Sequence, residues 1–341
     1  MTKSTLSRRS FVRGALAGSA ALGLWLRHTW AAEVAGNPSA GKIGDFKISL
    51  AEWSLHKALF SGQITNLDFP KIAREQYGIE AVEFVNQFFK GVAAGVPGQS
   101  KASSVRSSDG FSKDKAHDSP YLKDLKTRAG DHGVTCVLIM IDGEGDLSAE
   151  DKGARHKAVE NHKAWVDAAA SLGCHSIRVN TGGNYGPHKT EAAADGCGAL
   201  AEYGRTHKIH IICENHGGPS SDPDALVALI KAVDAPNFGT LPDFGNFPKD
   251  KRGRYSIDVY DAIARMMPYA RGVSAKSYDF DESGRERDLD FARILKIVTD
   301  SGYHGYVGIE YEGSKLGEPE GIFATKKLLE SLRGSAYRPR A

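Results

Sequence analysis

The sequence predicts a single (β/α)8 barrel, an α/β fold in which eight parallel strands alternate with eight helices. Apolar, β-branched runs of strand length recur between longer amphipathic runs, which is the pattern of parallel βαβ units. Several of these apolar runs end in polar residues, as strands do where they emerge at the mouth of a barrel. The count of eight strands favours a closed barrel over an open sheet.

The elements follow in a regular order. Strands are expected at residues 46–53, 79–85, 134–141, 176–180, 209–214, 238–243, 272–276 and 306–311. Helices are expected at residues 67–77, 121–132, 151–172, 191–207, 222–233, 257–267, 289–301 and 320–333. Start and stop signals support these bounds, because Pro70 lies in the first turn of one helix, Gly78 follows its end, and Asp222 and Pro223 open another. Residues 86–119 lack a periodic pattern, which is typical of a functional or disordered loop.

Composition narrows the classes of protein that fit. The chain has 341 residues, of which 41% are hydrophobic and 25% charged, the profile of a soluble globular protein with an ample core. The formal net charge is only +2, and the 44 basic and 42 acidic residues are interspersed, so no basic footprint for nucleic acid is present. The four cysteines form no CxxC pair, and we expect them to be small buried side chains instead of disulfides.

The N-terminus has the pattern of an export signal. Residues 7–13 (SRRSFVR) match the twin-arginine motif, and residues 15–26 are a weakly hydrophobic stretch that Arg27 ends. A membrane-spanning helix needs about 20 apolar residues, so this stretch predicts no stable membrane insertion. We therefore expect residues 1–35 to be a signal peptide for the twin-arginine export machinery, residues 42–335 to form the barrel, and the protein to be periplasmic. A short anchor that stays uncleaved is the alternative.

Three carboxylates end three of the expected strands. Glu214 follows an apolar run, Asp243 ends the next strand, and Glu310 lies near the end of the last one. Because the carboxyl ends of barrel strands meet at one mouth, these acids predict a site for a hard divalent cation, Mn or Mg, or for Zn. The alternative for each acid taken alone is a helix N-cap or a solvated loop residue.

Other polar residues share that face of the strands. Period-two alternation puts His216 on the side of Glu214, and Ser274 on the side of Lys276. Inward charges near strand ends are costly unless they are paired or used, although structural ion pairs explain them as well as substrate contacts do. The candidate substrate-binding residues are His56, Glu83, Arg178, His216, Asn246 and Lys276.

Four motifs resemble the xylose-isomerase-like superfamily, the sugar isomerase and epimerase group whose fold is a TIM barrel. They are residues 212–218 (ICENHGG), 241–247 (LPDFGNF), 273–276 (VSAK) and 308–313 (GIEYEG), within a resemblance that covers about residues 46–333. Epimerases of the superfamily hold a metal with Glu, Asp, His and Glu, which implies Glu214, Asp243 and Glu310 as the first, second and fourth ligands. Ser274 stands where those enzymes have the histidine, so the remaining ligand is open between Ser274 and His216.

The resemblance implies a divalent-metal-dependent sugar isomerase or epimerase. A divalent ion that holds a carbonyl and an adjacent hydroxyl acidifies the neighbouring C–H bond and stabilises the enediolate. Glu214 and Glu310 would then be the catalytic base and acid on the two faces of that carbon.

Three alternatives remain at this stage. The same intermediate can expel a β-substituent, which would make the protein a lyase acting on a 3-keto-glycoside. A non-catalytic periplasmic sugar-binding protein is the second alternative. A hydrolase of the endonuclease IV type is the third, but that chemistry needs many histidine ligands and a basic face for DNA. The identity of the sugar and association into a homo-oligomer are left open.

Overall fold

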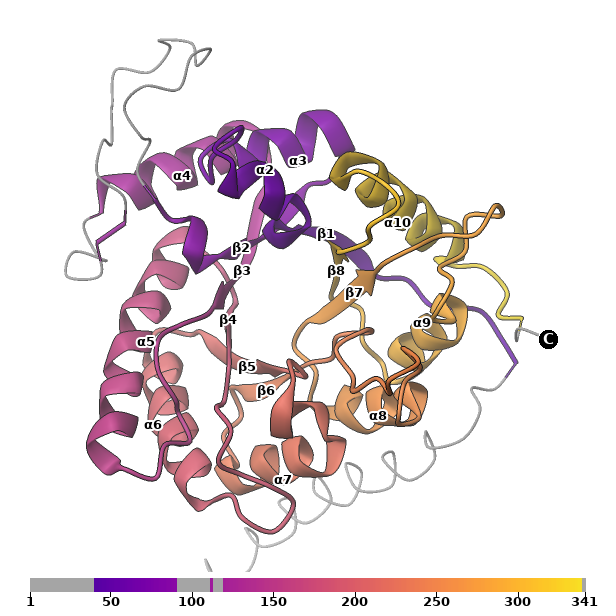
Figure 1. Cartoon of the computed structure of the whole chain (residues 1–341). Helices are drawn as coiled ribbons and strands as arrows, with labels where there is room; N and C mark the ends of the chain where they lie inside the picture. Colours follow the sequence, from indigo (N-terminus) through magenta and orange to yellow (C-terminus); the bar gives the residue numbers. More distant parts are fainter. Residues whose placement is uncertain (1–39, 91–110, 113–118, 339–341) are drawn as a thin grey trace, which may run out of the picture.

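Eight strands form a central ring with the helices around it (Figure 1). The computed structural model describes residues 40–90, 111–112 and 119–338, and the expected signal peptide lies outside them. The strands are β1 (Lys47–Ala51), β2 (Ala81–Val85), β3 (Thr135–Ile141), β4 (Ser176–Val179), β5 (His210–Glu214), β6 (Phe238–Leu241), β7 (Val273–Ser277) and β8 (Tyr306–Tyr311).

The sheet is parallel throughout, in the order β6, β5, β4, β3, β2, β1, β8, β7. Between β6 and β7 the ring closes through two isolated parallel bridges, Thr240 with Ala270 and Asp243 with Ser274. The backbone N–H of Ser274 donates to the carbonyl of Pro242 at 3.0 Å in this seam. The predicted eight-stranded barrel is therefore confirmed.

Eight of the helices that the structure describes lie close to their predicted positions, whereas the short helix at residues 56–60 was not predicted. The described helices are α2 (His56–Phe60), α3 (Phe69–Tyr77), α4 (Pro120–Asp131), α5 (Lys152–Leu172), α6 (Glu191–Thr206), α7 (Pro223–Val233), α8 (Val259–Met266), α9 (Phe291–Asp300) and α10 (Glu318–Leu332). Gly78 ends α3 in the left-handed conformation, with φ of 63°. The Asp222 side chain accepts from the backbone N–H of Asp224 and so caps α7, as its sequence signal predicts.

Among the described residues, four short 3-10 segments were also not anticipated, namely η1 (Glu52–Leu55), η2 (Asn86–Phe88), η4 (Gly218–Ser221) and η5 (Met267–Tyr269). The first strand ends at Ala51, two residues before the predicted end, because the chain turns there into η1 and α2. Ser54 drives this turn, since its hydroxyl donates to the Ile309 carbonyl at 3.0 Å and accepts from the Tyr311 N–H at 2.9 Å. The strand β1 thus ends where Ser54 bonds to the backbone of β8.

Side chains of the strands alternate between the barrel interior and the helices. On β2, the ring of Phe84 packs outward against Phe69 of α3, with centroids 6.0 Å apart. The adjacent Glu83 points inward, where its carboxylate accepts a hydrogen bond from the Ser49 hydroxyl at 2.5 Å. Alternate side chains along β2 therefore point to opposite faces, with Glu83 in the barrel interior and Phe84 in the layer beneath the helices.

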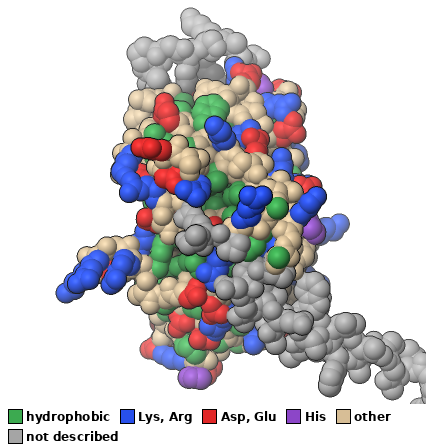
Figure 2. All heavy atoms as spheres, turned by 90° about the vertical axis from the view of Figure 1, so that its right-hand side faces the viewer, with side chains coloured by type: hydrophobic (Ala, Val, Ile, Leu, Met, Phe, Trp, Pro, Cys, Tyr) green, Lys and Arg blue, Asp and Glu red, His purple; other side chains and the backbone are tan. Residues whose placement is uncertain are grey.

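Acidic and basic side chains are interspersed on the face shown in Figure 2, apart from one projecting arm that carries mostly Lys and Arg. Within the described ranges, no helix combines the length and apolarity that crossing a bilayer requires. All four cysteines are buried and unpaired, as expected from their apolar surroundings.

Candidate metal centre

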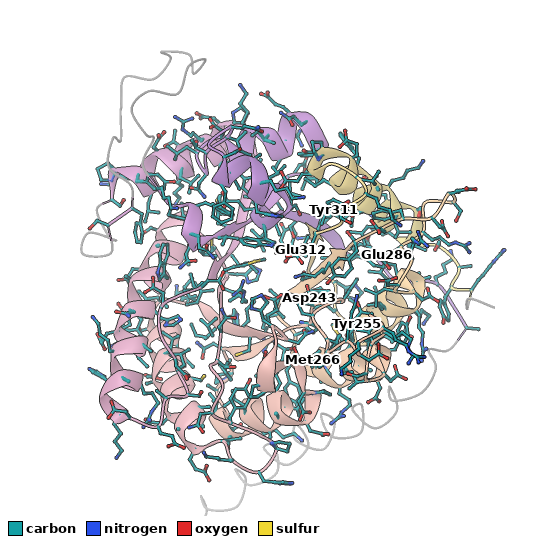
Figure 3. All side chains as sticks on the ribbon, in the orientation of Figure 1. Asp243, Tyr255, Met266, Glu286, Tyr311 and Glu312 are labelled. Carbon is teal, nitrogen blue, oxygen red and sulfur yellow. The ribbon has the colours of Figure 1, made fainter. Side chains whose placement is uncertain are left out.

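The three acids at the strand ends meet inside the barrel mouth. One carboxylate oxygen from each of Glu214, Asp243 and Glu310 lies within 4.8 Å of the others. All three side chains are buried, with exposed fractions of 3%, 0% and 5% respectively. Figure 3 shows Asp243 on the inner side of the ring of strands. The register of neighbouring strands brings these acids together. Glu214 of β5 pairs with Leu241 of β6, which lies two residues before Asp243, and Asp243 forms a parallel bridge with Ser274 of β7.

The turn after β6 holds Asp243 in one orientation. Its Oδ1 accepts from the backbone N–H groups of Gly245 and Asn246 at 2.8 and 2.7 Å. The side-chain amide of Asn215 clamps the Asp243 backbone, because it accepts from the N–H at 2.7 Å and donates to the carbonyl at 3.0 Å. The second carboxylate oxygen, Oδ2, is buried and has no hydrogen-bond partner among the described residues.

Two buried cations lie against these acids. Arg178 Nη1 is 2.7 Å from Asp142 Oδ1, and its Nε is 3.0 Å from Glu214 Oε2 in a geometry that makes no hydrogen bond. Lys276 Nζ is 2.9 Å from Glu310 Oε1 and 3.3 Å from Glu312 Oε2.

Charge at this site is unbalanced. The acid cluster and the ion pairs around it comprise five carboxyl groups, those of Asp142, Glu214, Asp243, Glu310 and Glu312, and the two cations of Arg178 and Lys276. Five possible negative charges against two positive ones leave a surplus of three. Burial of an unpaired carboxylate costs free energy, so the carboxyl groups of this site should either bind protons or bind an added cation.

The pKa values follow from this imbalance. Burial raises the pKa of Glu214 to about 7, against the opposing effect of Arg178 and with a further rise from Glu310. Burial likewise raises the pKa of Asp243 to about 7, although Lys276 opposes it. Burial also acts on Glu310, but the adjacent Lys276 outweighs it and holds the pKa of Glu310 below its ordinary value. Two of the three acids thus take up protons near neutral pH unless a cation binds.

The donor set fits a hard divalent cation. Glu214 Oε2 and Asp243 Oδ2 are buried oxygens that lack hydrogen bonds within the described part of the chain. Glu310 adds a third carboxylate, and one oxygen from each acid lies within 4.8 Å of the others. Oxygen donors of this kind suit Mg, Mn or Zn. A divalent ion would also offset most of the surplus negative charge.

Ser274, predicted as the remaining ligand, lies beside this group. Its Oγ is 3.3 Å from Glu310 Oε2, at the seam between β7 and β8. The described residues place no histidine among the clustered metal-ligating side chains. The alternative ligand His216 is exposed, and its Nδ1 lies 3.2 Å from Asn180 Oδ1.

The predicted substrate contacts occupy three different places. Asn246 lies within the site, where it donates to Glu214 Oε1 at 2.8 Å and accepts from Lys276 Nζ at 3.0 Å. Glu83 lies inside the barrel on β2 against Ser49. His56 begins α2, where its ring stacks on Trp53 with centroids 5.0 Å apart. Arg178 and Lys276 pair with carboxylates, one of the two roles that their position left open.

Two residues of the site, Asp142 and Glu312, were missed. Asp142 follows β3 and accepts from Arg178 and from Asn180 Nδ2 at 2.7 Å each. Glu312 accepts from Trp53 Nε1 at 2.5 Å and approaches Lys276, and Figure 3 shows it on the inner side of the ring. A signal was present in both cases, since Glu312 is two residues beyond Glu310 and Asp142 directly follows a fully apolar strand.

Comparison with known families gives one match over most of the chain. Residues 75–333 match the family model described as xylose isomerase-like TIM barrel. Among solved structures, the chain is similar to a sugar phosphate isomerase/epimerase from Parabacteroides distasonis, with a TM-score of 0.59, 17% identity, and coverage of 87% of this chain and 96% of that one. It is also similar to a D-psicose 3-epimerase, with a TM-score of 0.59, 13% identity, and coverage of 85% and 100%. At these identities the likeness concerns the fold.

Sequence relatives match over a shorter region. A C-glycoside deglycosidase alpha subunit of Arthrobacter globiformis is 42% identical over 71 residues, which is 20% of each chain. Another protein of that name from the same organism is 30% identical over 73 residues, 21% of this chain and 20% of the relative. The match thus spans about a fifth of the length of these curated relatives.

Proposed function

The chain belongs to the xylose isomerase-like TIM barrel family, and from that premise we propose that it is a divalent-metal-dependent sugar isomerase or epimerase. The reaction would begin by removal of a proton next to the carbonyl of a sugar. The observation that carries this proposal is the buried cluster of Glu214, Asp243 and Glu310, which has surplus negative charge and two buried oxygens that accept no hydrogen bond from the described residues.

Each residue of the cluster has a chemical task in this proposal. When bound, a divalent cation would supply a Lewis acid that polarises the sugar carbonyl. Glu214 and Glu310 come from β5 and β8 and would serve as the acid–base pair on the two faces of the carbon that loses its proton, with the ionised Glu310 as the base and Glu214 as the acid. Asp243, fixed by the turn after β6, would serve as a ligand.

Lys276 contributes a fixed positive charge. Burial acts to lower its pKa, but Glu310, Asp243 and Glu214 outweigh that effect and hold the pKa well above the ordinary value. A permanently protonated Lys276 keeps Glu310 ionised and can donate to an oxygen that gains charge in the reaction. Arg178 lies 3.0 Å from Glu214 and opposes the rise in the pKa of that acid, but it does not overcome the effect of burial.

A second candidate is a β-elimination at the same site. The enolate formed by proton removal would expel the substituent on the next carbon, so that one C–H bond and one bond to the leaving group break while a C=C bond forms. The leaving group then takes a proton from the acid. The similarity to proteins named C-glycoside deglycosidase alpha subunits favours this candidate, over the fifth of their length that matches.

The test combines metal content with proton exchange. The protein loaded with Mn is incubated in D2O with free sugars and with 3-keto-glycosides, and deuterium uptake and products are read by NMR. We expect uptake next to the carbonyl, with an isomer or an elimination product identifying the candidate. Absence of uptake with every substrate, in a protein that holds Mn, would favour the non-catalytic sugar-binding alternative.

Variants then separate binding from catalysis. Asp243→Asn should lower bound Mn, measured by mass spectrometry of the metal. Glu214→Gln and Glu310→Gln should each abolish turnover even at saturating Mn, whereas the exposed control Glu282→Gln should match the wild type. Near wild-type turnover in both metal-loaded active-site variants would refute the two-glutamate mechanism.

We also propose that the protein acts in the periplasm after twin-arginine export, on the strength of residues 7–13. Replacing Arg8 and Arg9 by lysine should retain the precursor in the cytoplasm, which cell fractionation measures. Periplasmic accumulation of that variant would contradict the export proposal.

A further inference from the structure

Four aromatic rings, those of Trp53, His56, Phe60 and Phe88, form a cluster where β1 and β2 lead into η1, α2 and η2, beside β1 and β2 in Figure 1. We call them the aromatic platform. Trp53 contacts each of the other three rings, and His56 joins the cluster by stacking on Trp53. Phe60 meets Trp53 edge-on, with centroids 6.0 Å apart and planes at 90°, and meets Phe88 at 5.0 Å and 64°. Trp53 and Phe88 are 6.1 Å apart. None of these rings forms part of the acid cluster.

The platform is anchored on several sides. Glu52 Oε2 accepts from the Val85 N–H at 2.8 Å, which ties η1 to the end of β2, and Ser54 ties it to β8. Glu318 of α10 accepts from the N–H groups of Lys57 and Ala58 at 2.7 and 3.2 Å, so α2 is capped by another element. A rigid support of this kind reduces the entropy lost when a ligand binds.

A continuous chain of contacts joins the platform to the acid cluster. Trp53 Nε1 donates to Glu312 Oε1 at 2.5 Å. The other oxygen of Glu312 is 3.3 Å from Lys276 Nζ, which is 2.9 Å from Glu310. Two side chains, Glu312 and Lys276, therefore connect the aromatic platform to Glu310 of the acid cluster, where the sugar carbonyl is proposed to react.

Part of the platform faces solvent. Phe60 is 54% exposed, and Trp53 and His56 are partly exposed. A single exposed phenylalanine is ordinary on a protein surface. Phe60 differs because its ring completes an aromatic surface that continues to the edge of the buried acids.

The platform's chemistry selects an aromatic ligand over a second sugar. Trp53 Nε1 is already bonded to Glu312, and His56 Nδ1 lies 2.7 Å from the carbonyl oxygen of Trp53. With these two polar atoms engaged, the platform offers few hydrogen-bond partners to the hydroxyl groups of another sugar, which would lose water on binding there. Ring faces and edges remain available, and aromatic groups pair with them in stacked or edge-to-face geometry.

On the basis of the proposed function, we propose that the aromatic platform binds the aromatic aglycone of a glycoside whose sugar carbonyl lies at the acid cluster. The substrate is then a glycoside and not a free sugar. Aldose–ketose isomerisation needs a free anomeric carbon and does not fit such a substrate. Epimerisation of a keto-glycoside and elimination from it both remain.

The kinetic test compares two aglycones on one sugar. The full chain, loaded with Mn, is assayed with the phenyl and methyl glycosides of 3-keto-glucose. We expect the wild type to prefer the phenyl glycoside in kcat/KM on the order of tenfold, and Phe60→Ala to lower that preference about three- to tenfold. Phe60→Trp should retain the preference.

Phe323→Ala is the matched control. Phe323 is 50% exposed and touches one ring, Tyr77 at 5.1 Å, on the outer layer between α10 and α3. Its removal should leave the phenyl preference intact. An unchanged preference in Phe60→Ala would overturn the platform proposal while the proposed function stands.

A binding test separates failure of the platform from failure of the proposed function. Saturation-transfer NMR with phenyl β-glucoside reports contact with the phenyl protons without any turnover. Transfer to those protons that falls in Phe60→Ala and persists in Phe323→Ala supports the platform, whether or not the keto-glycosides react. Absent transfer in the wild type, or equal transfer in the two variants, overturns it.

Discussion

Replacement of Glu83 by glutamine should change how stability depends on pH. Glu83 is 2% exposed inside the barrel, where Oε1 accepts from Ser49 and Oε2 has no hydrogen-bond partner in the described part of the structure. Gly308 leaves room for this carboxyl group, since a Cβ there would lie 2.6 Å from both oxygens. Burial raises the pKa of Glu83 to about 8, with the Ser49 hydrogen bond opposing and Glu310 and Glu214 adding.

The sign and the size follow from proton linkage. Unfolded Glu83 releases its proton near pH 4.5 and folded Glu83 near pH 8. Between these values the folded state binds more protons, so this group's contribution to stability is complete below pH 4.5 and is lost as the pH rises toward 8. The slope approaches about 1.4 kcal/mol per pH unit, or roughly 2.5 kcal/mol between pH 5 and 7. Glutamine has nearly the same shape but cannot ionise, so the stability of Glu83→Gln should not fall with pH through this position.

The assay is urea unfolding followed by circular dichroism at pH 5, 6, 7 and 8. A chelator keeps cation binding out of the comparison. From pH 5 to 7, the free energy of unfolding of the wild type should fall by roughly 2.5 kcal/mol relative to that of Glu83→Gln. The exposed control Glu282→Gln should run parallel to the wild type. Parallel curves for Glu83→Gln and the wild type would refute a protonated Glu83 in the folded barrel.

Three further outcomes are expected. Ser54→Ala removes the buried partner of the Ile309 carbonyl and the Tyr311 N–H, so the free energy of unfolding should fall by about 2 to 4 kcal/mol; a change below 0.5 kcal/mol would contradict the anchor. Gly321→Ala, whose Cβ would lie 2.2 Å from the Tyr311 ring, should destabilise by about 1 to 3 kcal/mol, whereas Gly130→Ala in open space on α4 should not. The four buried cysteines should react with a thiol reagent only after unfolding, and rapid labelling of the folded protein would contradict their burial.

The strand ends were predicted more securely than the segments between them. Apolar runs that stop at polar residues located β5 and β8 within a residue or two, because burial on both faces of a parallel strand leaves a continuous apolar signature. The turn of η1 had no such signature. Ser54 bonds to β8, more than 250 residues away along the chain, and no local pattern reports that contact.

The sequence alone was enough to predict that Glu214, Asp243 and Glu310 share one end of a barrel, since strand order and period two assign each side chain to an end and a face. Only the tertiary structure decided how they meet. Register between neighbouring strands brings their oxygens within 4.8 Å, and it sets Lys276 against Glu310. The same register makes Glu312 a link between Lys276 and Trp53. Periodicity specifies the face of a strand but not its stagger against the next strand, and that stagger determines which charges touch.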